Sequence, residues 1–202
     1  MFDHIENTIR DLKEVEIPLS RKQNLNQLRD FVQDRKDHSQ IINLIFICTH
    51  NSRRSHLSQV WAQTMAAYFK LSNLFCYSGG TEATALFPAA AEALVAAGFR
   101  METLSNGKNP IHSIRFDQAS PSIIGFSKKY DHLFNPTQDF AAILTCSSAD
   151  NDCPFIPGAL RRIALPYQDP KSSDGSPEQE EVYFSRSLEI AAELYYVFSQ
   201  IQ

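Results

Sequence analysis

The strongest constraint in this sequence is a junction between an apolar run and a polar loop. Residues 41–47, IINLIFI, are apolar and rich in isoleucine, which is typical of a buried parallel strand. Residues 48–55, CTHNSRRS, follow directly, and apolar residues then recur at helical spacing from Leu57 to Tyr68. A strand, a tight loop and a helix in this order form the repeating unit of an α/β fold.

Further strands and helices alternate along the rest of the chain. Additional strands are predicted at 75–77, 141–145 and 162–165. Helices are predicted at 57–68, 88–97 and 178–201. The alternation predicts an α/β three-layer sandwich, with a central, mainly parallel sheet of about four strands and helices on both faces.

Two segments stand apart from this alternation. Residues 1–40 contain two helical patterns separated by Pro18 and no chemical motif, so we expect an N-terminal helical arm that packs on the domain or on a partner. Residues 41–202 form the α/β domain. Within it, residues 105–137 are rich in Asn, Ser, Pro and Gly, which indicates a long insertion with room for one or two extra strands.

Composition excludes several classes of function. A net charge of −4 argues against nucleic-acid binding, which needs a basic face. The longest nearly apolar run, 89–98, is about half a membrane span, and the acidic N-terminus lacks a signal-peptide core. We therefore expect a cytoplasmic protein with no membrane contact. Four cysteines in a chain of this length need no disulfide framework.

The loop that follows the first strand has the character of an anion-binding site. Backbone N–H groups in a loop between a strand and a helix converge on one point, and the helix dipole adds positive potential there. Cys48 lies at the floor of this field, which favours its nucleophilic thiolate. The residues expected to bind a tetrahedral oxyanion are Thr49, His50, Asn51, Ser52, Arg53, Arg54 and Ser55.

Individual side chains in this loop suggest separate roles. Arg54 is suited to close the site with a bidentate guanidinium. Ser55 is placed to donate a hydrogen bond to the Cys48 sulfur, and Asn51 to pin the loop through its amide. Arg53 either adds positive potential or points to solvent, and the sequence leaves both open.

Two later segments have chemistry that spacing alone leaves open. Cys146 and Cys153 flank a polar loop after a predicted strand, either as unrelated thiols or as a pair that forms a transient disulfide. No His or further Cys lies at zinc-ligand spacing, so we expect no metal and no cofactor. Asp169, in an Asp-Pro loop, is either part of a turn or a general acid near a leaving group.

Together these segments resemble the low-molecular-weight protein-tyrosine-phosphatase superfamily, and more closely its thioredoxin-coupled arsenate reductase branch. The segments that carry the resemblance are CTHNSRRS, YSGGTEAT, TCSSADNDCP and YQDP. It covers roughly 41–201, less the insertion. His50 stands where the family usually has glycine, and Gln59 where several reductases carry an acidic residue tied to potassium.

The resemblance implies a mechanism. Cys48 would attack arsenate held by Arg54 and the loop, and Asp169 would protonate the departing oxygen. Cys146 would then attack the adduct, releasing arsenite and leaving a Cys48–Cys146 disulfide. Cys153 would move the disulfide to the Cys146–Cys153 pair, which thioredoxin would reduce.

Two other functions remain open at this stage. A low-molecular-weight protein-tyrosine phosphatase, hydrolysing phosphomonoesters through a Cys48 phospho-enzyme, needs only Cys48, Arg54 and Asp169. A wide, aromatic-lined entrance would be its structural sign. A non-enzymatic oxyanion sensor is the third hypothesis, and the intact nucleophile and acid argue against it.

Overall fold

The computed structural model describes residues 1–147, 149 and 155–202 of the chain. Its helices are α1 (Asp3–Asp11), α2 (Leu19–Asp37), α3 (Arg54–Tyr68), α4 (Pro88–Ala96) and α6 (Gln179–Phe198), with 3₁₀ turns η1 (Leu12–Glu14) and η2 (Pro170–Ser173). Its strands are β1 (Ile42–Cys48), β2 (Leu74–Gly80), β3 (Arg100–Thr103), β4 (His112–Arg115), β5 (Ile123–Gly125), β6 (Phe140–Leu144) and β7 (Ala159–Ala164).

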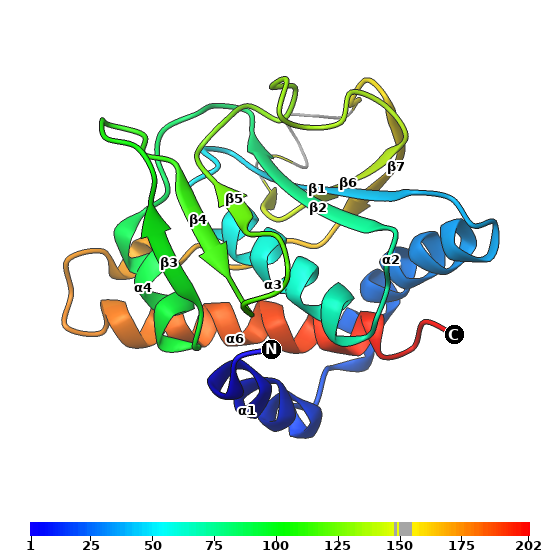
Figure 1. Ribbon diagram of the computed structural model, residues 1–202, viewed down its shortest axis with the longest axis horizontal. Coiled ribbons are helices and arrows are strands. Elements are labelled where there is room, and N and C mark those ends of the chain that lie inside the picture. Colours follow the sequence, from blue (N-terminus) through cyan, green and yellow to red (C-terminus); the bar gives the residue numbers. More distant parts are fainter. Residues whose placement is uncertain (148, 150–154) are drawn as a thin grey trace.

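The central sheet has four parallel strands in the order β2-β1-β6-β7 (Figure 1). Burial of β1 and β6 on both faces explains why their sequences are continuously apolar. The register places Cys48, at the end of β1, opposite Gly80, at the end of β2. The predicted α/β class, with a parallel sheet of about four strands, is confirmed.

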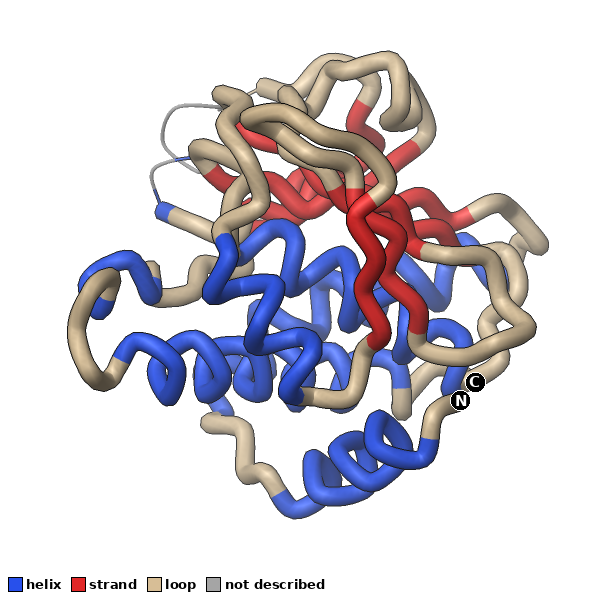
Figure 2. Tube along the Cα trace, turned by 60° about the vertical axis from the view of Figure 1, so that its left-hand side comes forward, coloured by secondary structure: helices blue, strands red, loops and turns tan. Residues whose placement is uncertain are grey.

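The two faces of this sheet are covered differently. The five named helices lie on one face, where β1 residues such as Leu44 and Phe46 join a core shared with α2, α3 and α6 (Figures 1 and 2). The opposite face carries a smaller cluster that includes Ile45, Ile47 and Phe140, and Tyr130 and Ile156 cover it from loops. In the described part of the chain, this layer is therefore made mainly of loops rather than of the helices predicted for it.

A second sheet lies outside the predicted alternation. Strands β3, β4 and β5 form it as antiparallel neighbours, with Arg100 opposite Arg115 and Ile114 opposite Ile123. Only β4 and β5 fall within 105–137, because β3 ends at Thr103, before that segment begins. Strand β3 was not predicted, since it is four residues long and mostly exposed, which leaves no apolar pattern.

The N-terminal arm packs on α6. Ile5 and Ile9 of α1 are fully buried in the main core. Arg21 of α2 donates from Nε and Nη2 to the two carboxylate oxygens of Glu193 on α6, at 2.6 and 2.8 Å. Among the described residues, no helix is both long and apolar enough to cross a membrane.

Side chains from α3 cap the outer edge of β2. Gln63 accepts from the Cys76 N–H at 2.9 Å and donates to the Leu74 carbonyl at 3.2 Å. Gln59 donates to the Cys76 carbonyl at 3.2 Å. These amides take the place of a neighbouring strand, so backbone groups at the sheet edge are satisfied within the chain.

We predict that Gln63→Ala lowers the free energy of unfolding by about 1–3 kcal/mol, because the buried Cys76 N–H loses its acceptor. Urea unfolding at neutral pH measures the change. Gln23→Ala, at an exposed position on α2, is the control and should leave stability nearly unchanged. Equal effects of the two substitutions would contradict the capping role of Gln63.

Candidate active site

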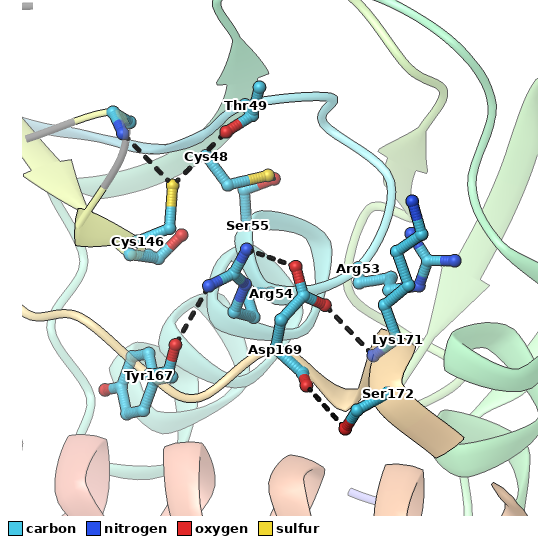
Figure 3. Close-up of polar contacts among 12 residues, drawn as sticks. Cys48, Thr49, Arg53, Arg54, Ser55, Cys146, Tyr167, Asp169, Lys171 and Ser172 are labelled. Carbon is cyan, nitrogen blue, oxygen red and sulfur yellow. Dashed lines mark hydrogen bonds and ion pairs between the residues drawn. The ribbon is translucent and has the colours of Figure 1, made fainter. Parts of the chain in front are cut away.

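A cavity of about 400 Å³ opens beside the carboxyl end of β1. The described residues that line it are Cys48, Thr49, His50, Ser52, Arg53, Arg54, Asp169 and Lys171. They come from the loop between β1 and α3 and from the segment that leads into η2 (Figure 3). The structure thus brings the candidate nucleophile, the candidate anion-binding arginine and the candidate acid to one small polar cavity.

The carbonyl groups of the loop after Cys48 are bonded to segments outside the loop. The Cys48 and Thr49 carbonyls accept from the backbone N–H groups of Thr81 and Glu82 at 3.2 and 2.8 Å. The Ser52 carbonyl accepts from the Phe87 N–H at 2.9 Å. Because N–H and C=O point in opposite directions across a peptide plane, the N–H that follows each of these carbonyls points away from the outer segment. This is the backbone arrangement that an anion-binding loop requires.

Gly80 allows this outer segment to approach the loop. A Cβ atom at residue 80 would lie 2.6 Å from the Thr49 carbonyl oxygen and 2.7 Å from the Asn51 nitrogen. Any side chain there would push the loop and β2 apart. The Gly-Gly pair at 79–80 therefore has a packing role beside the candidate site.

Hydrogen bonds in series orient the candidate nucleophile. The Lys128 N–H donates to Asn51 Oδ1 at 2.9 Å, and Asn51 Nδ2 donates to Ser55 Oγ, also at 2.9 Å. Ser55 Oγ lies 3.1 Å from Cys48 Sγ. Because Ser55 already accepts from Asn51, its own proton is free for the Cys48 sulfur. Asn51 has a φ of 44°, a left-handed backbone conformation that asparagine tolerates better than most residues.

Arg54 and Asp169 form an ion pair at the cavity. Arg54 Nη2 donates to Asp169 Oδ2 at 2.5 Å, and Nη1 donates to the Tyr167 carbonyl at 2.9 Å (Figure 3). Asp169 Oδ1 also accepts from the Lys171 N–H at 3.1 Å. The acid is therefore held against the arginine that is expected to bind the anion.

The Arg53 side chain does not point to solvent, although the residue lines the cavity. Its guanidinium donates to Tyr183 Oη at 2.5 Å and to Asp174 Oδ2 at 2.6 Å, and it lies over the Phe87 ring with Cζ 4.1 Å from the centroid. The side chain is only 11% exposed and is directed away from Cys48 (Figure 3). The cause is a pair of acceptors, the buried Tyr183 and the more exposed Asp174, that the local sequence does not reveal.

Cys146 lies beside the candidate nucleophile, past the end of β6. It is buried, and its Sγ is 3.6 Å from Thr49 Oγ1 and accepts from the Ala149 N–H at 3.3 Å. Figure 3 shows Cys146 and Cys48 on the same side of the site. Cys48 and Cys146 are free thiols. Cys153, the predicted partner of Cys146, lies outside the described residues.

A second layer of residues, not predicted from the sequence, surrounds the loop. Ser127 Oγ donates to the His50 carbonyl at 2.9 Å and accepts from the Thr84 N–H at 2.8 Å. Asn109 is bonded reciprocally to the Ser127 backbone at 2.8 and 3.0 Å. The segment 105–137 therefore supports the candidate site, and its richness in Asn and Ser was the available signal.

Lys128 is buried next to this layer. It is 1% exposed, its Nζ lies 4.5 Å from the Phe126 ring centroid and 5.3 Å from that of Phe134, and burial lowers its pKa to about 8. Burial, followed by the charge of Lys128, lowers the pKa of His56 to about 3. His56 is therefore neutral at physiological pH.

Comparison with known proteins gives a consistent result. No family model matches the chain. The arsenate reductase of Bacillus licheniformis is 25% identical over 143 residues, which cover 71% of this chain and 84% of the relative. A low-molecular-weight phosphotyrosine phosphatase from Vibrio cholerae has a similar fold, with a TM-score of 0.53 at 13% identity, over 78% of this chain and 94% of the other. An arsenate reductase in a phosphate-binding state gives a TM-score of 0.50 at 16% identity, over 80% and 100%.

The cavity, its cysteine and these relatives define a cysteine-dependent oxyanion enzyme with an α/β fold. In fold the chain is similar to low-molecular-weight protein tyrosine phosphatases, and in sequence it is similar to arsenate reductases. The family resemblance noted in the sequence is confirmed.

We predict that Asp169→Ala tightens the binding of inorganic phosphate by about 2- to 5-fold, because the anion no longer competes with Asp169 for Arg54. Calorimetric titration measures the dissociation constant. Asp30→Ala, which removes an aspartate paired with Arg29 on α2, is the control and should leave phosphate binding unchanged. Weaker binding by Asp169→Ala would show that the carboxyl group supports the anion instead.

A second prediction concerns pH. The pKa of Lys128 is about 8 in the folded chain and ordinarily 10.5, so between these values the unfolded chain binds more protons. The free energy of unfolding should therefore increase by roughly 3 kcal/mol in total as the pH is raised through this window. Urea unfolding across the window should show this rise in the wild type and in Lys129→Met, which removes an exposed lysine, and not in Lys128→Met. The same rise in Lys128→Met would rule out Lys128 as its source.

Proposed function

We propose that this protein reduces arsenate to arsenite, with Cys48 as the nucleophile and Cys146 and Cys153 as the thiols that carry the oxidation away. One observation supports this most strongly: a second buried thiol, Cys146, in contact with the residue that follows Cys48, with Thr49 Oγ1 and Cys146 Sγ 3.6 Å apart. Hydrolysis of an ester requires no such thiol. The arsenate reductases among the relatives support the same choice.

In the first step, the Cys48 thiolate attacks arsenic and forms a sulfur–arsenic bond. One arsenate oxygen leaves as water, with a proton from Asp169. The loop N–H groups and Arg54 hold the remaining oxygens, once the anion has displaced Asp169 from the Arg54 guanidinium. Arsenic is still pentavalent at this point.

Reduction takes place in the second step. The Cys146 thiolate attacks Cys48 Sγ, a disulfide forms, and the electron pair of the sulfur–arsenic bond stays on arsenic, which leaves as arsenite. Two thiols are oxidised and arsenic gains two electrons. Cys153 then attacks Cys146, which frees Cys48 and leaves a Cys146–Cys153 disulfide.

The proposal includes thioredoxin as the reductant of that final disulfide and a cytoplasmic location where thioredoxin acts. Both rest on the resemblance of TCSSADNDCP to the redox segment of thioredoxin-coupled reductases.

The lining of the cavity favours a small inorganic anion over an aryl phosphate ester. The described residues around the cavity include His50, Arg53, Arg54 and Lys171 but no Phe, Tyr or Trp. An aryl phosphatase would be expected to hold its substrate ring between apolar or aromatic walls. Phosphatase activity therefore stays the alternative, tested together with the reductase.

We predict that Cys146→Ser abolishes arsenite formation in an assay with thioredoxin, its reductase and NADPH. The rate of p-nitrophenyl phosphate hydrolysis should stay within about 3-fold of wild type, because only reduction needs the second thiol. Cys153→Ser should complete one turnover and accumulate the Cys48–Cys146 disulfide, identified by mass mapping. Cys76→Ala, a buried cysteine on β2, is the matched control and should keep turnover.

Three outcomes would count against the reductase. Repeated turnover in Cys153→Ser would exclude the role of the third cysteine. Arsenite formation in Cys146→Ser would exclude the proposed electron path. A wild-type protein that hydrolyses the phosphate ester, forms no arsenite and is unaffected by Cys146→Ser would instead be a phosphatase.

A further inference from the structure

Arg53 connects the loop between β1 and α3 to the far end of the loop that carries Asp169. Its Nε donates to Tyr183 Oη and its Nη2 donates to Asp174 Oδ2, while Tyr183 Oη donates to Asp174 Oδ1 at 2.6 Å. The side chains of Arg53, Tyr183 and Asp174 are thus bonded to one another in a closed triangle, and each of the three N–H or O–H donors has a different acceptor atom. Burial, followed by the bond to Asp174, raises the pKa of Tyr183, so the hydroxyl stays protonated and keeps donating.

The loop between Asp169 and Asp174 is short and internally bonded. It contains the 3₁₀ turn η2, in which the Ser173 hydroxyl donates to the Pro170 carbonyl at 2.8 Å and the Asp174 N–H donates to the Lys171 carbonyl at 3.0 Å. A displacement of Asp174 is therefore passed on to Asp169 through a stiff turn.

Two consecutive arginines thus hold the two ends of one loop. Arg54 holds Asp169, and Arg53 holds Asp174. The Arg53 backbone is fixed because it is the residue that precedes α3, and its guanidinium is fixed between Asp174, Tyr183 and the Phe87 ring. When an oxyanion takes Arg54 away from Asp169, the contact made by Arg53 remains.

We propose that Arg53 is a positioning residue. It keeps the carboxyl group of Asp169 within reach of the leaving group after the substrate has displaced Asp169 from Arg54. Because it concerns the acid of the reaction proposed above, this inference rests on that proposal. It assigns the tandem arginines different tasks, with Arg54 binding the anion and Arg53 holding the acid. The Arg53 guanidinium is satisfied by its own partners and does not contact the oxyanion.

The test uses the full chain with Arg53→Met and two phosphate esters. Asp169 matters more for phenyl phosphate, a poor leaving group, than for p-nitrophenyl phosphate. We expect Arg53→Met to lower kcat for phenyl phosphate by roughly 10- to 100-fold, with a smaller loss for p-nitrophenyl phosphate. KM and the dissociation constant of inorganic phosphate should stay within about 3-fold of wild type.

The double variant Arg53→Met with Asp169→Asn should be no slower than Asp169→Asn alone, because Arg53 acts through Asp169. Asp174→Asn should reproduce Arg53→Met. Arg100→Met is the matched control: Arg100 also stacks on a ring, with Cζ 4.0 Å from the Phe2 centroid, but lies away from the cavity. Its kinetics should equal those of the wild type. Single-turnover arsenite formation is measured for the same set of variants.

Other results overturn either this assignment or the reductase proposal on which it rests. A weaker phosphate affinity with unchanged kcat in Arg53→Met would make Arg53 an anion-binding residue. An equal loss of kcat for both esters, or a further loss of kcat in the double variant, would show that Arg53 has only a general structural role. If the wild type hydrolyses the esters but forms no arsenite, the reductase proposal fails and the esters still decide the role of Arg53. A wild type inactive in both assays would overturn both proposals.

Discussion

The site depends on how the carbonyl groups of residues 48–52 are bound. An anion-binding loop has N–H groups facing its centre, and that arrangement is stable only if the carbonyl groups find donors on the other side. Here the backbone N–H groups of Thr81, Glu82 and Phe87 and the Ser127 hydroxyl provide those donors. Removing this outer layer would leave polar groups of the loop unsatisfied, so the layer and the loop are one structural unit. Gly80 belongs to this unit, because only glycine leaves room for the close approach.

A second unit holds Asp169, the candidate acid. The Asp169 loop is held by Arg54 at one end and by Arg53 at the other, and the N-terminal arm adds a third arginine. Arg21 lies over the ring of Tyr167, with Cζ 4.8 Å from the centroid, and the carbonyl of Tyr167 accepts from Arg54. Two contacts therefore connect the arm to the Arg54 guanidinium. Burial of Ile5 and Ile9 in the main core makes it part of the domain rather than a loose extension.

Sequence patterns predicted those parts of the fold and of the candidate site that depend on residues close together in the chain. The apolar run before Cys48 is a strand because it is buried on both faces, and the loop residues gather because they are consecutive. The contacts of Arg53 were hidden because Asp174 lies 121 residues further along the chain. Burial of Lys128 was hidden for a similar reason, since a lysine gives no apolar signal and its surroundings come from the folded insertion. Strand β3 is exposed and short, so no periodicity marked it.

The order of strands explains why two thiols meet at this site. Strands β1 and β6 are adjacent and parallel, with Ile47 opposite Leu144, so the residues that follow them emerge at the same edge of the sheet. Cys48 ends the first strand and Cys146 lies just past the second. A hydrolase needs water at this edge, and a disulfide-forming reductase needs a sulfur. Because Thr49 lies next to Cys48 and contacts Cys146, the sheet brings the second thiol to the loop that begins at the first, and this juxtaposition is the observation on which the proposed reductase function rests.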